Sequence, residues 1–314
     1  MIVTVTLNPS VDRTVEVGGF RRGTLLRATG GQVEAGGKGI NVTKALSANR
    51  VDSVAVLPVG GAEGRHLGDL LAVDGVPAVL VPVGPPTRSN VSVVEPDGTV
   101  TKVNERGGGL SEAELGAIRD AVVEQVPGAA WVVLAGSLPA DVPDSSYGEA
   151  VRRLREVGVP VAVDTSGSAL VEAIKNGPDL AKPNLTELES VVGRRLTTLG
   201  AVAEAARLLQ GAGVDTVLAS LGSDGAVLVE REGRVWHGEA GTARCSAVGA
   251  GDALLAGFLA AGAVGPDALG EALRWAAAAV SLPGSGMPGP DDIQRVQVRV
   301  RPDFAPERRL VDRD

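Results

Sequence analysis

The run Val-Gly-Ala-Gly-Asp at residues 248–252 places two glycines and a carboxylate directly before an apolar stretch that predicts a buried helix. Glycine lets backbone N–H groups approach a ligand closely, and the N–H groups at a helix N-terminus attract anions. A carboxylate beside an anion site is useful when it accepts a proton while the N–H groups hold developing negative charge. We therefore expect catalytic roles for Gly249, Ala250, Gly251 and Asp252. The alternative is a tight turn in which Asp252 only caps the helix.

A second glycine-rich turn, Gly-Gly-Lys-Gly-Ile-Asn-Val at 36–42, precedes a helix expected over 42–49. It differs from a Walker phosphate loop, because the residue after Lys38 is neither Ser nor Thr and the first glycine of that motif is missing. Its glycines, together with Lys38 and Asn41, suit close approach and hydrogen bonding to a polyhydroxylated ligand.

A third motif, Asn184-Leu-Thr-Glu187, follows Lys182-Pro183 at an expected strand-to-helix junction. A Glu three residues after an Asn forms a capping box, which would be a purely structural role. The functional interpretation is that Asn184 and Glu187 orient a water-coordinated Mg²⁺ beside a polyphosphate, because bound Mg²⁺ keeps several of its waters.

The elements that must position these motifs are short apolar strands alternating with helices. Strands are expected at 2–8, 53–58, 131–135, 159–164, 179–182 and 216–220, with helices near 145–157, from 184 and at 199–211. Such a pattern indicates a mostly parallel sheet covered by helices on both faces. Ligands bind beyond the carboxyl ends of these strands. Polar or glycine residues fall there at Asn8, Asp12, Ser137, Asp164, Lys182, Asn184, Ser220 and Gly222.

Two stretches, 13–35 and 88–105, instead alternate apolar and polar residues around a turn at 95–98. We expect a small sheet that lies over the main domain as a lid and excludes water, with an apolar face that could pair with a second copy. The alternative is a pair of hairpins on the edge of the main sheet. Residues 1–12, 36–87 and 106–314 then form the α/β domain.

Composition excludes several classes of protein. A net charge of −8 without a basic block argues against nucleic-acid binding, and 2% aromatic residues leave few platforms for stacking bases. A single cysteine, Cys245, permits no disulfide within the chain and suits the cytoplasm. His66 and His237 lack metal-ligand spacing. We expect no signal peptide at the N-terminus and no membrane span, since the apolar run 275–282 is too short.

One further glycine pattern, Gly284-x-Gly286-x-x-Gly289, matches a dinucleotide fingerprint by letters only. It follows an expected helix rather than a strand and contains Pro288, so a nicotinamide oxidoreductase is not expected.

The three motifs at 36–42, 182–187 and 248–252 resemble, in the right order, the signatures of the ribokinase-like PfkB carbohydrate kinases. The resemblance covers nearly the whole chain and implies a three-layer α/β/α domain, a β-sheet lid, and the use of ATP and Mg²⁺. Four further segments, at 6–12, 87–90, 136–139 and 164–167, are similar to the branch of that family whose members phosphorylate ketohexose phosphates.

The resemblance also implies a role for each matching residue. Asp252 would be the base for the acceptor hydroxyl, and the backbone of 249–251 would form the anion hole. The expected sugar-phosphate ligands are Asp12, Gly37, Asn41 and Ser137, with Lys38, Arg88 and Arg27 for the phosphate. The expected ATP and Mg²⁺ ligands are Lys182, Asn184, Glu187, Ser220 and Gly222, with Mg²⁺ held through water by Asn184 and Glu187.

The expected reaction is conversion of fructose 1-phosphate to fructose 1,6-bisphosphate by a homodimer that pairs through its lids. Fructose 6-phosphate and tagatose 6-phosphate are the alternative acceptors. A non-catalytic sugar-phosphate sensor is the alternative from another class, although Asp252 and its glycines are intact. One departure is Ala247, where the family usually has a hydroxyl residue.

Overall fold

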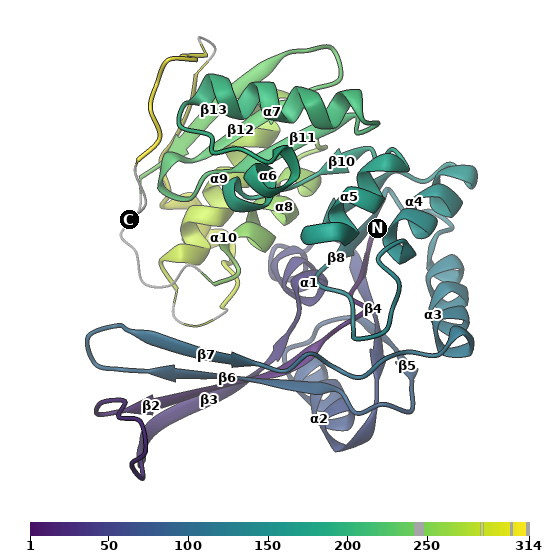
Figure 1. Ribbon diagram of the computed structural model, residues 1–314, viewed down its shortest axis with the longest axis vertical. Helices are drawn as coiled ribbons and strands as arrows, with labels where there is room; N and C mark the ends of the chain where they lie inside the picture. The colour runs from purple at the N-terminus through teal and green to yellow at the C-terminus, as the bar shows by residue number, and fades with distance from the viewer. Residues whose placement is uncertain (242–247, 283, 285, 302–303, 312–314) are drawn as a thin grey trace.

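The computed structural model describes residues 1–241, 248–282, 284, 286–301 and 304–311. A ten-stranded sheet crosses the molecule (Figure 1). Its strands in spatial order are β14 (Val298–Arg301), β13 (Val235–Ala240), β12 (Ala226–Val229), β11 (Thr216–Ser220), β10 (Leu180–Ala181), β9 (Val161–Asp164), β8 (Trp131–Ala135), β1 (Ile2–Val5), β4 (Ser53–Val59) and β5 (Ala78–Pro82). Neighbouring strands from β11 to β5 pair in parallel, and β12, β13 and β14 extend the sheet as antiparallel strands.

Helices cover both faces of this sheet because its strands are apolar on both sides. In β1, Val3 and Val5 face one core cluster, whereas Ile2 faces the other. The helices on the first face are α3 (Glu112–Gln125), α4 (Ser146–Glu156), α5 (Gly167–Lys175), α6 (Leu185–Val192) and α7 (Leu199–Gly211). Those on the second face are α1 (Lys38–Ala48), α2 (Gly61–Val73), α8 (Ala250–Ala260), α9 (Gly265–Val280) and α10 (Pro290–Gln294). The predicted three-layer α/β/α class is confirmed.

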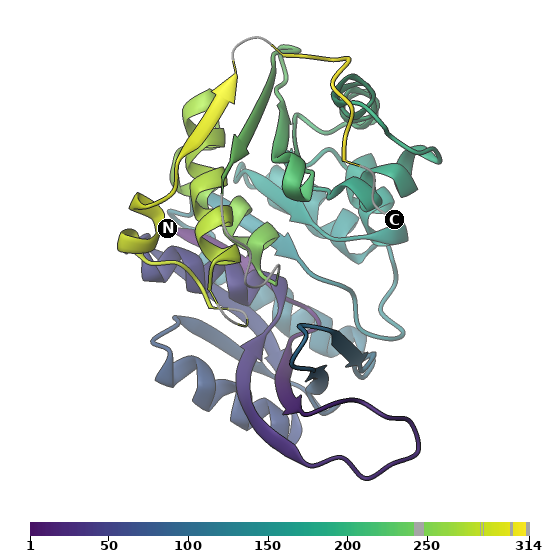
Figure 2. The same ribbon diagram turned by 90° about the vertical axis from the view of Figure 1, so that its left-hand side faces the viewer.

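A separate four-stranded sheet projects from one end of the main domain (Figures 1 and 2). Its strands in spatial order are β3 (Ala28–Gly36), β2 (Ser10–Val17), β6 (Arg88–Val94) and β7 (Val100–Asn104). We call it the lid sheet. The predicted small sheet is therefore confirmed, and the alternative of two edge hairpins is wrong, because β2 pairs with β6 rather than with a strand of the main sheet.

The lid sheet leads directly into the glycine turn at 36–42. Strand β3 ends at Gly36, and α1 already begins at Lys38, four residues before the expected start of this helix. The reason is Gly37, whose φ of +137° lets it serve as the N-cap immediately before Lys38. Lys38 and Asn41 consequently lie on the first turns of one helix.

Candidate active site

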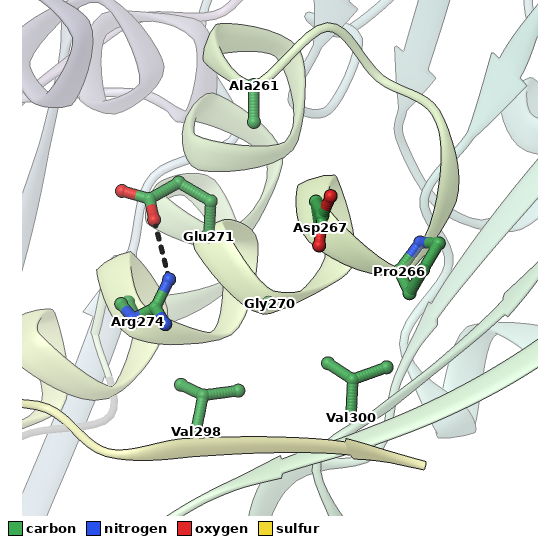
Figure 3. A pocket seen from close by; sticks show the side chains of 8 residues that line it. All are labelled: Ala261, Pro266, Asp267, Gly270, Glu271, Arg274, Val298 and Val300. Carbon is green, nitrogen blue, oxygen red and sulfur yellow. Dashed lines mark hydrogen bonds and ion pairs between the residues drawn. The ribbon is translucent and has the colours of Figure 1, made fainter. Parts of the chain in front are cut away.

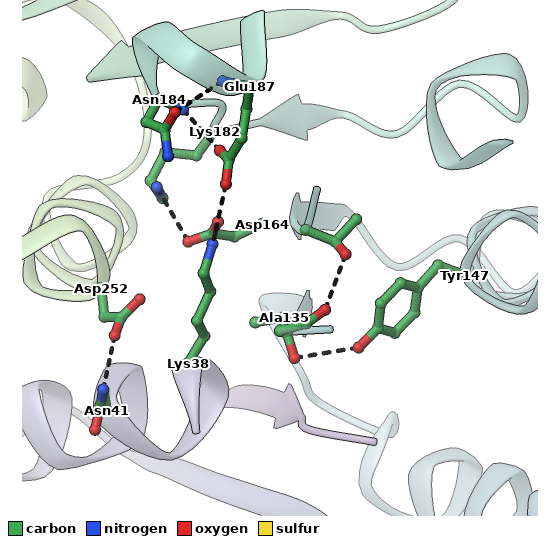
Figure 4. Close-up of polar contacts among 11 residues, drawn as sticks. Lys38, Asn41, Ala135, Tyr147, Asp164, Lys182, Asn184, Glu187 and Asp252 are labelled. Atoms are coloured by element: carbon green, nitrogen blue, oxygen red, sulfur yellow. Dashed lines mark hydrogen bonds and ion pairs between the residues drawn. The ribbon is translucent and has the colours of Figure 1, made fainter. Parts of the chain in front are cut away.

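Asp252 lies in the first turn of α8, directly after the glycine turn. Gly249, with a φ of +77°, is the N-cap of this helix, so the alternative in which Asp252 is the cap is wrong. The carboxylate is 6% exposed, and the Nδ2 of Asn41 donates a hydrogen bond of 2.8 Å to its Oδ2 (Figure 4). The two glycine-rich motifs thus meet at one buried acidic group.

The environment of Asp252 disfavours its charged form. Burial, followed by the negative charge of Asp164, raises its pKa to about 7, against the opposing effects of Lys38, Lys182 and the Asn41 hydrogen bond. A carboxyl group with a pKa near neutrality can both accept and release a proton under ordinary conditions.

Asp164, at the carboxyl end of β9, is the centre of an ion cluster (Figure 4). Its Oδ1 lies 2.7 Å from the Nζ of Lys38, and its Oδ2 lies 3.1 Å from the Nζ of Lys182. Burial opposes ionisation of Asp164, but the two ammonium groups hold its pKa below the usual value. The sequence placed Asp164 at a strand end but did not select it as a site residue, because nothing local announces a partner 126 residues away.

Lys38 points into this cluster from α1. Its Nζ also lies 3.6 Å from the Oε1 of Glu187. Burial alone would lower the pKa of Lys38, but Asp164 and Glu187 together raise it above its usual range. Lys38 was expected to bind the substrate phosphate with Arg88, and the structure adds ion pairs of Lys38 with Asp164, the last residue of β9, and with Glu187 of α6.

Lys182 lies beside the glycine turn of α8. It is 3% exposed, and a Cβ atom added to Gly251 would lie 3.3 Å from its Nζ. This ammonium group therefore adjoins the backbone N–H groups at the start of α8. An anion at this point would meet a positive charge and a helix N-terminus together.

Asn184 and Glu187 form the capping box that their spacing predicts. The N–H of Glu187 donates to Asn184 Oδ1, and the N–H of Asn184 donates to Glu187 Oε2, each at 2.8 Å. The structural interpretation is confirmed, and it leaves Glu187 Oε1 facing Lys38. Ser220, at the end of β11, pairs with Asn184 in an isolated bridge. Gly222 follows at the start of the short 3₁₀ helix η1 (Gly222–Asp224).

A second polar group lies in the lid sheet around Asp12. Its Oδ1 accepts hydrogen bonds from Ser10 Oγ at 2.6 Å and from Asn90 Nδ2 at 2.8 Å. Asn90 was not predicted as a site residue, although it lies in the segment 87–90, which is similar to the family. Gly36 lies against the same carboxylate, because an added Cβ atom would overlap it.

Arg88 lies at the base of the lid. Its guanidinium donates to the backbone carbonyls of Asn8, at 3.0 and 3.2 Å, and of Glu105, at 2.9 Å. Asn8 in turn donates to Ser137 Oγ at 3.2 Å, so Arg88 and Ser137 are brought together through Asn8. Arg27 is exposed in the connection between β2 and β3.

Cys245 and Ala247 lie outside the described residues. Among the residues that the structure describes, no helix is long and apolar enough to cross a membrane. In the same part of the chain, no three His, Cys, Asp or Glu side chains group as a metal site. A cavity of about 630 Å³ lies between α9 and β14, and none of the candidate site residues lines it (Figure 3).

The arrangement defines a class of protein. Glycine N–H groups, lysines and a buried carboxylate at the carboxyl ends of a parallel sheet suit phosphoryl transfer, where positioning and charge stabilisation carry most of the catalysis. The family model for pfkB family carbohydrate kinases matches residues 5–288, and the chain belongs to this family.

Individual relatives agree with this membership. The chain is 41% identical to the 1-phosphofructokinase of Rhodobacter capsulatus over 92% of each chain. It is 33% identical to the ATP-dependent 6-phosphofructokinase isozyme 2 of Escherichia coli over 94% of this chain and 97% of the relative. The crystal structure of Phosphofructokinase-2 from Escherichia coli in complex with potassium superposes with a TM-score of 0.88 at 33% identity, covering 94% and 97% of the two chains. The predicted class, an ATP-dependent sugar-phosphate kinase, is confirmed.

Proposed function

We propose that the protein transfers the γ-phosphoryl group of ATP to fructose 1-phosphate and so forms fructose 1,6-bisphosphate. The single observation that carries the catalytic part is the buried carboxylate of Asp252, which Asn41 orients beside the glycine turn of α8. The choice of acceptor is supported by the 41% identity to a 1-phosphofructokinase.

In this proposal Asp252 is the general base. The acceptor hydroxyl oxygen of the sugar forms a bond to the γ-phosphorus while its proton passes to an oxygen of Asp252, and ADP leaves. The N–H groups of Gly249, Ala250 and Gly251 hold the negative charge on the transferred group, and Lys182 adds a positive charge beside them. Asn41 keeps the carboxylate aimed at the acceptor.

The sugar phosphate is proposed to lie between α1 and the lid sheet. Asp12, Gly37 and Asn41 would bind its hydroxyl groups, and Ser10 and Asn90 hold Asp12 in place. Arg88 and Ser137 would bind the substrate phosphate from the base of the lid, and Arg27 from its connecting loop. Lys38 is assigned to the reacting end of the substrate, because it is paired with Asp164 beside Lys182.

ATP is proposed to bind along Lys182, Asn184, Ser220 and Gly222, at the ends of β10 and β11. Carboxylate oxygens of Asp164 and Glu187 face this place, and such hard oxygen donors suit Mg²⁺. Mg²⁺ would neutralise phosphate charge there. Glu187 and Asn184 would hold its waters rather than the ion itself, since both already form the capping box.

The same site could accept a 6-phosphate, which the likeness to an isozyme of 6-phosphofructokinase supports. A coupled assay of ADP release across fructose 1-phosphate, fructose 6-phosphate, tagatose 6-phosphate and unphosphorylated sugars separates the acceptors. We expect the highest kcat/KM with fructose 1-phosphate. Preference for a 6-phosphate would overturn the acceptor, and no ADP release with any sugar would overturn the proposed reaction.

We also propose a homodimer that pairs through the lid sheets of residues 13–35 and 88–105, with residues 1–12, 36–87 and 106–314 as the kinase domain. Val103 of β7 supports this, because this apolar side chain is 62% exposed on one face of the lid sheet. Val103→Lys should convert a dimer to a monomer in light scattering, and an unchanged mass would contradict this interface. The single cysteine and the use of ATP suit a cytoplasmic enzyme.

A further inference from the structure

Asp224 is a buried carboxylate that the proposed reaction does not use. It ends the 3₁₀ helix η1 and is 3% exposed. Its Oδ2 accepts a hydrogen bond of 3.0 Å from the backbone N–H of Val311, and its Oδ1 lies 3.7 Å from the Nη2 of Arg308. Asp224 therefore ties η1 to residues 304–311, which we call the C-terminal strap.

The C-terminal strap is itself fixed to the main domain on two sides. It is the yellow segment that runs past β13 and α7 (Figures 1 and 2). Three backbone hydrogen bonds of 2.8–3.0 Å join it to the start of α7, from Leu310 to Thr197, from Gly200 to Pro306 and from Leu199 to Arg308. The guanidinium of Arg308 also pairs with Glu239 of β13.

Strand β13 also contacts η1. The Nε2 of His237 donates a hydrogen bond of 2.8 Å to the carbonyl oxygen of Asp224. A Cβ atom added to Gly225 would overlap the carbonyl oxygen of Gly238, so the chain after η1 also lies tightly against β13. The turn is thus clamped between the C-terminal strap and a strand of the main sheet.

The helix η1 is continuous in the chain with two residues that are proposed to bind ATP. Gly222 begins η1, and Ser220 precedes it by two residues. The N–H of Ser220 donates to the carbonyl oxygen of Pro183 at 3.0 Å, directly before Asn184. A displacement of η1 would therefore move the backbone at Ser220 and Gly222.

We propose that Asp224 and Arg308 are positioning residues for ATP, which act by fixing the backbone of η1 before the nucleotide arrives. A site that is ordered in advance loses less entropy on binding, so its ligand binds more tightly. This inference rests on the proposed function for the place of ATP. The C-terminal strap lies beyond residues 5–288, the part of the chain that matches the family.

The test compares Arg308→Gln with Arg309→Gln, because Arg309 is the adjacent and exposed arginine of the same strap. We expect Arg308→Gln and Asp224→Asn to raise the KM for ATP by about 2- to 30-fold, the range for changes along a network of contacts. Their kcat and their KM for the sugar phosphate should stay within about two-fold of the wild-type values. Arg309→Gln should match the wild type in all three.

A lower melting temperature alone would not support the proposal, because a merely structural clamp would give it as well. An ATP KM for Arg308→Gln equal to that of Arg309→Gln would overturn it. If Arg308→Gln does not fold, Val311→Pro replaces it, since proline has no backbone N–H to donate to Asp224 and leaves Arg308 in the chain.

Calorimetric titration with ATP separates this inference from the proposed function, because it needs no sugar phosphate. Weaker ATP binding by Arg308→Gln, but not by Arg309→Gln, supports the positioning role even if no ADP is released with any sugar. Equal ATP affinities of the two variants overturn the positioning role even if the kinase reaction is confirmed.

Discussion

Asn41 of α1 donates a hydrogen bond of 2.8 Å to Asp252 of α8, across 211 residues of sequence. The contact joins the helix that follows the lid sheet to the helix that begins at the glycine turn of 249–251. Because the lid strand β3 ends at Gly36 and α1 begins at Lys38, this contact also connects the lid sheet to the start of α8.

Asp252→Asn should lower kcat by at least about 10²-fold, the usual effect of losing a placed general base. ATP binding should be nearly unchanged, because the glycine turn and Lys182 remain. Single-turnover kinetics and calorimetric titration with ATP measure the two effects. Asp267→Asn, an exposed change on α9, is the control, and near-wild-type turnover of Asp252→Asn would exclude the role of base.

The pH dependence of kcat/KM should show an acid limb with an apparent pKa of about 7, because Asp252 must be ionised to accept a proton. Lys38→Met removes a positive charge that lowers this pKa, so its acid limb should move to higher pH. Asp164→Asn removes a negative charge that raises it, so its limb should move to lower pH. If the acid limb of kcat/KM has the same apparent pKa in both variants as in the wild type, the titrating group is not Asp252.

The ionisation of Asp252 should favour catalysis but reduce the free energy of unfolding. The folded-state pKa of Asp252 is raised above its ordinary value, so the folded protein binds this proton more tightly than the unfolded chain. Stability from this group is present at low pH and is lost as the pH rises through about 7. Asp252→Asn should therefore raise the melting temperature more at pH 8 than at pH 5; an equal gain at both values would contradict the raised pKa.

Gly36→Ala should raise the KM for the sugar phosphate and leave the KM for ATP unchanged. The added methyl group would overlap the carboxylate of Asp12 and displace it from Ser10 and Asn90. Gly30→Ala in the same strand is the matched control, since its methyl group meets only the exposed side chain of Glu16. Steady-state kinetics of both variants measure these values. Equal KM values for the sugar phosphate in the two variants would contradict a role of Asp12 in sugar binding.

Glu187→Gln should raise the Mg²⁺ concentration needed for half-maximal rate while leaving stability nearly unchanged. Glutamine can still complete the capping box with Asn184 but carries no charge. Glu187→Ala should lose both functions and cost about 1 kcal/mol of stability, the usual effect of a lost cap. Mg²⁺ titrations and urea unfolding measure these outcomes. An unaltered Mg²⁺ requirement in Glu187→Gln would contradict the assigned role.

Thr6→Val should stabilise the protein by about 1 kcal/mol, because the Oγ1 of Thr6 is buried and has no hydrogen-bond partner among the described residues. Thr4→Val, two residues earlier in β1, is the matched control. It should destabilise the protein, since it leaves Thr43 without the 2.7 Å hydrogen bond that Thr4 now makes. Urea unfolding of both variants gives the comparison, and a less stable Thr6→Val would refute the unpaired hydroxyl.

The sequence alone determined the fold class and the order of the motifs. Apolar strands such as 131–135 and amphipathic helices carry their periodicity locally, and the lid strands alternate with a period of two. The capping box of Asn184 and Glu187 was also readable, because its hydrogen bonds span only three residues.

Only the tertiary structure decided which charges meet. Asp164 pairs with Lys38 and Lys182 because the start of α1 lies beside the carboxyl ends of β9 and β10, a proximity that no local pattern records. For the same reason, no local pattern predicts the ion pairs of Lys38 with Asp164 and Glu187. The burial of Asp252 and its proximity to Asp164, which raise the pKa of the proposed base, and its contact with Asn41 likewise arise from packing between segments far apart in the sequence.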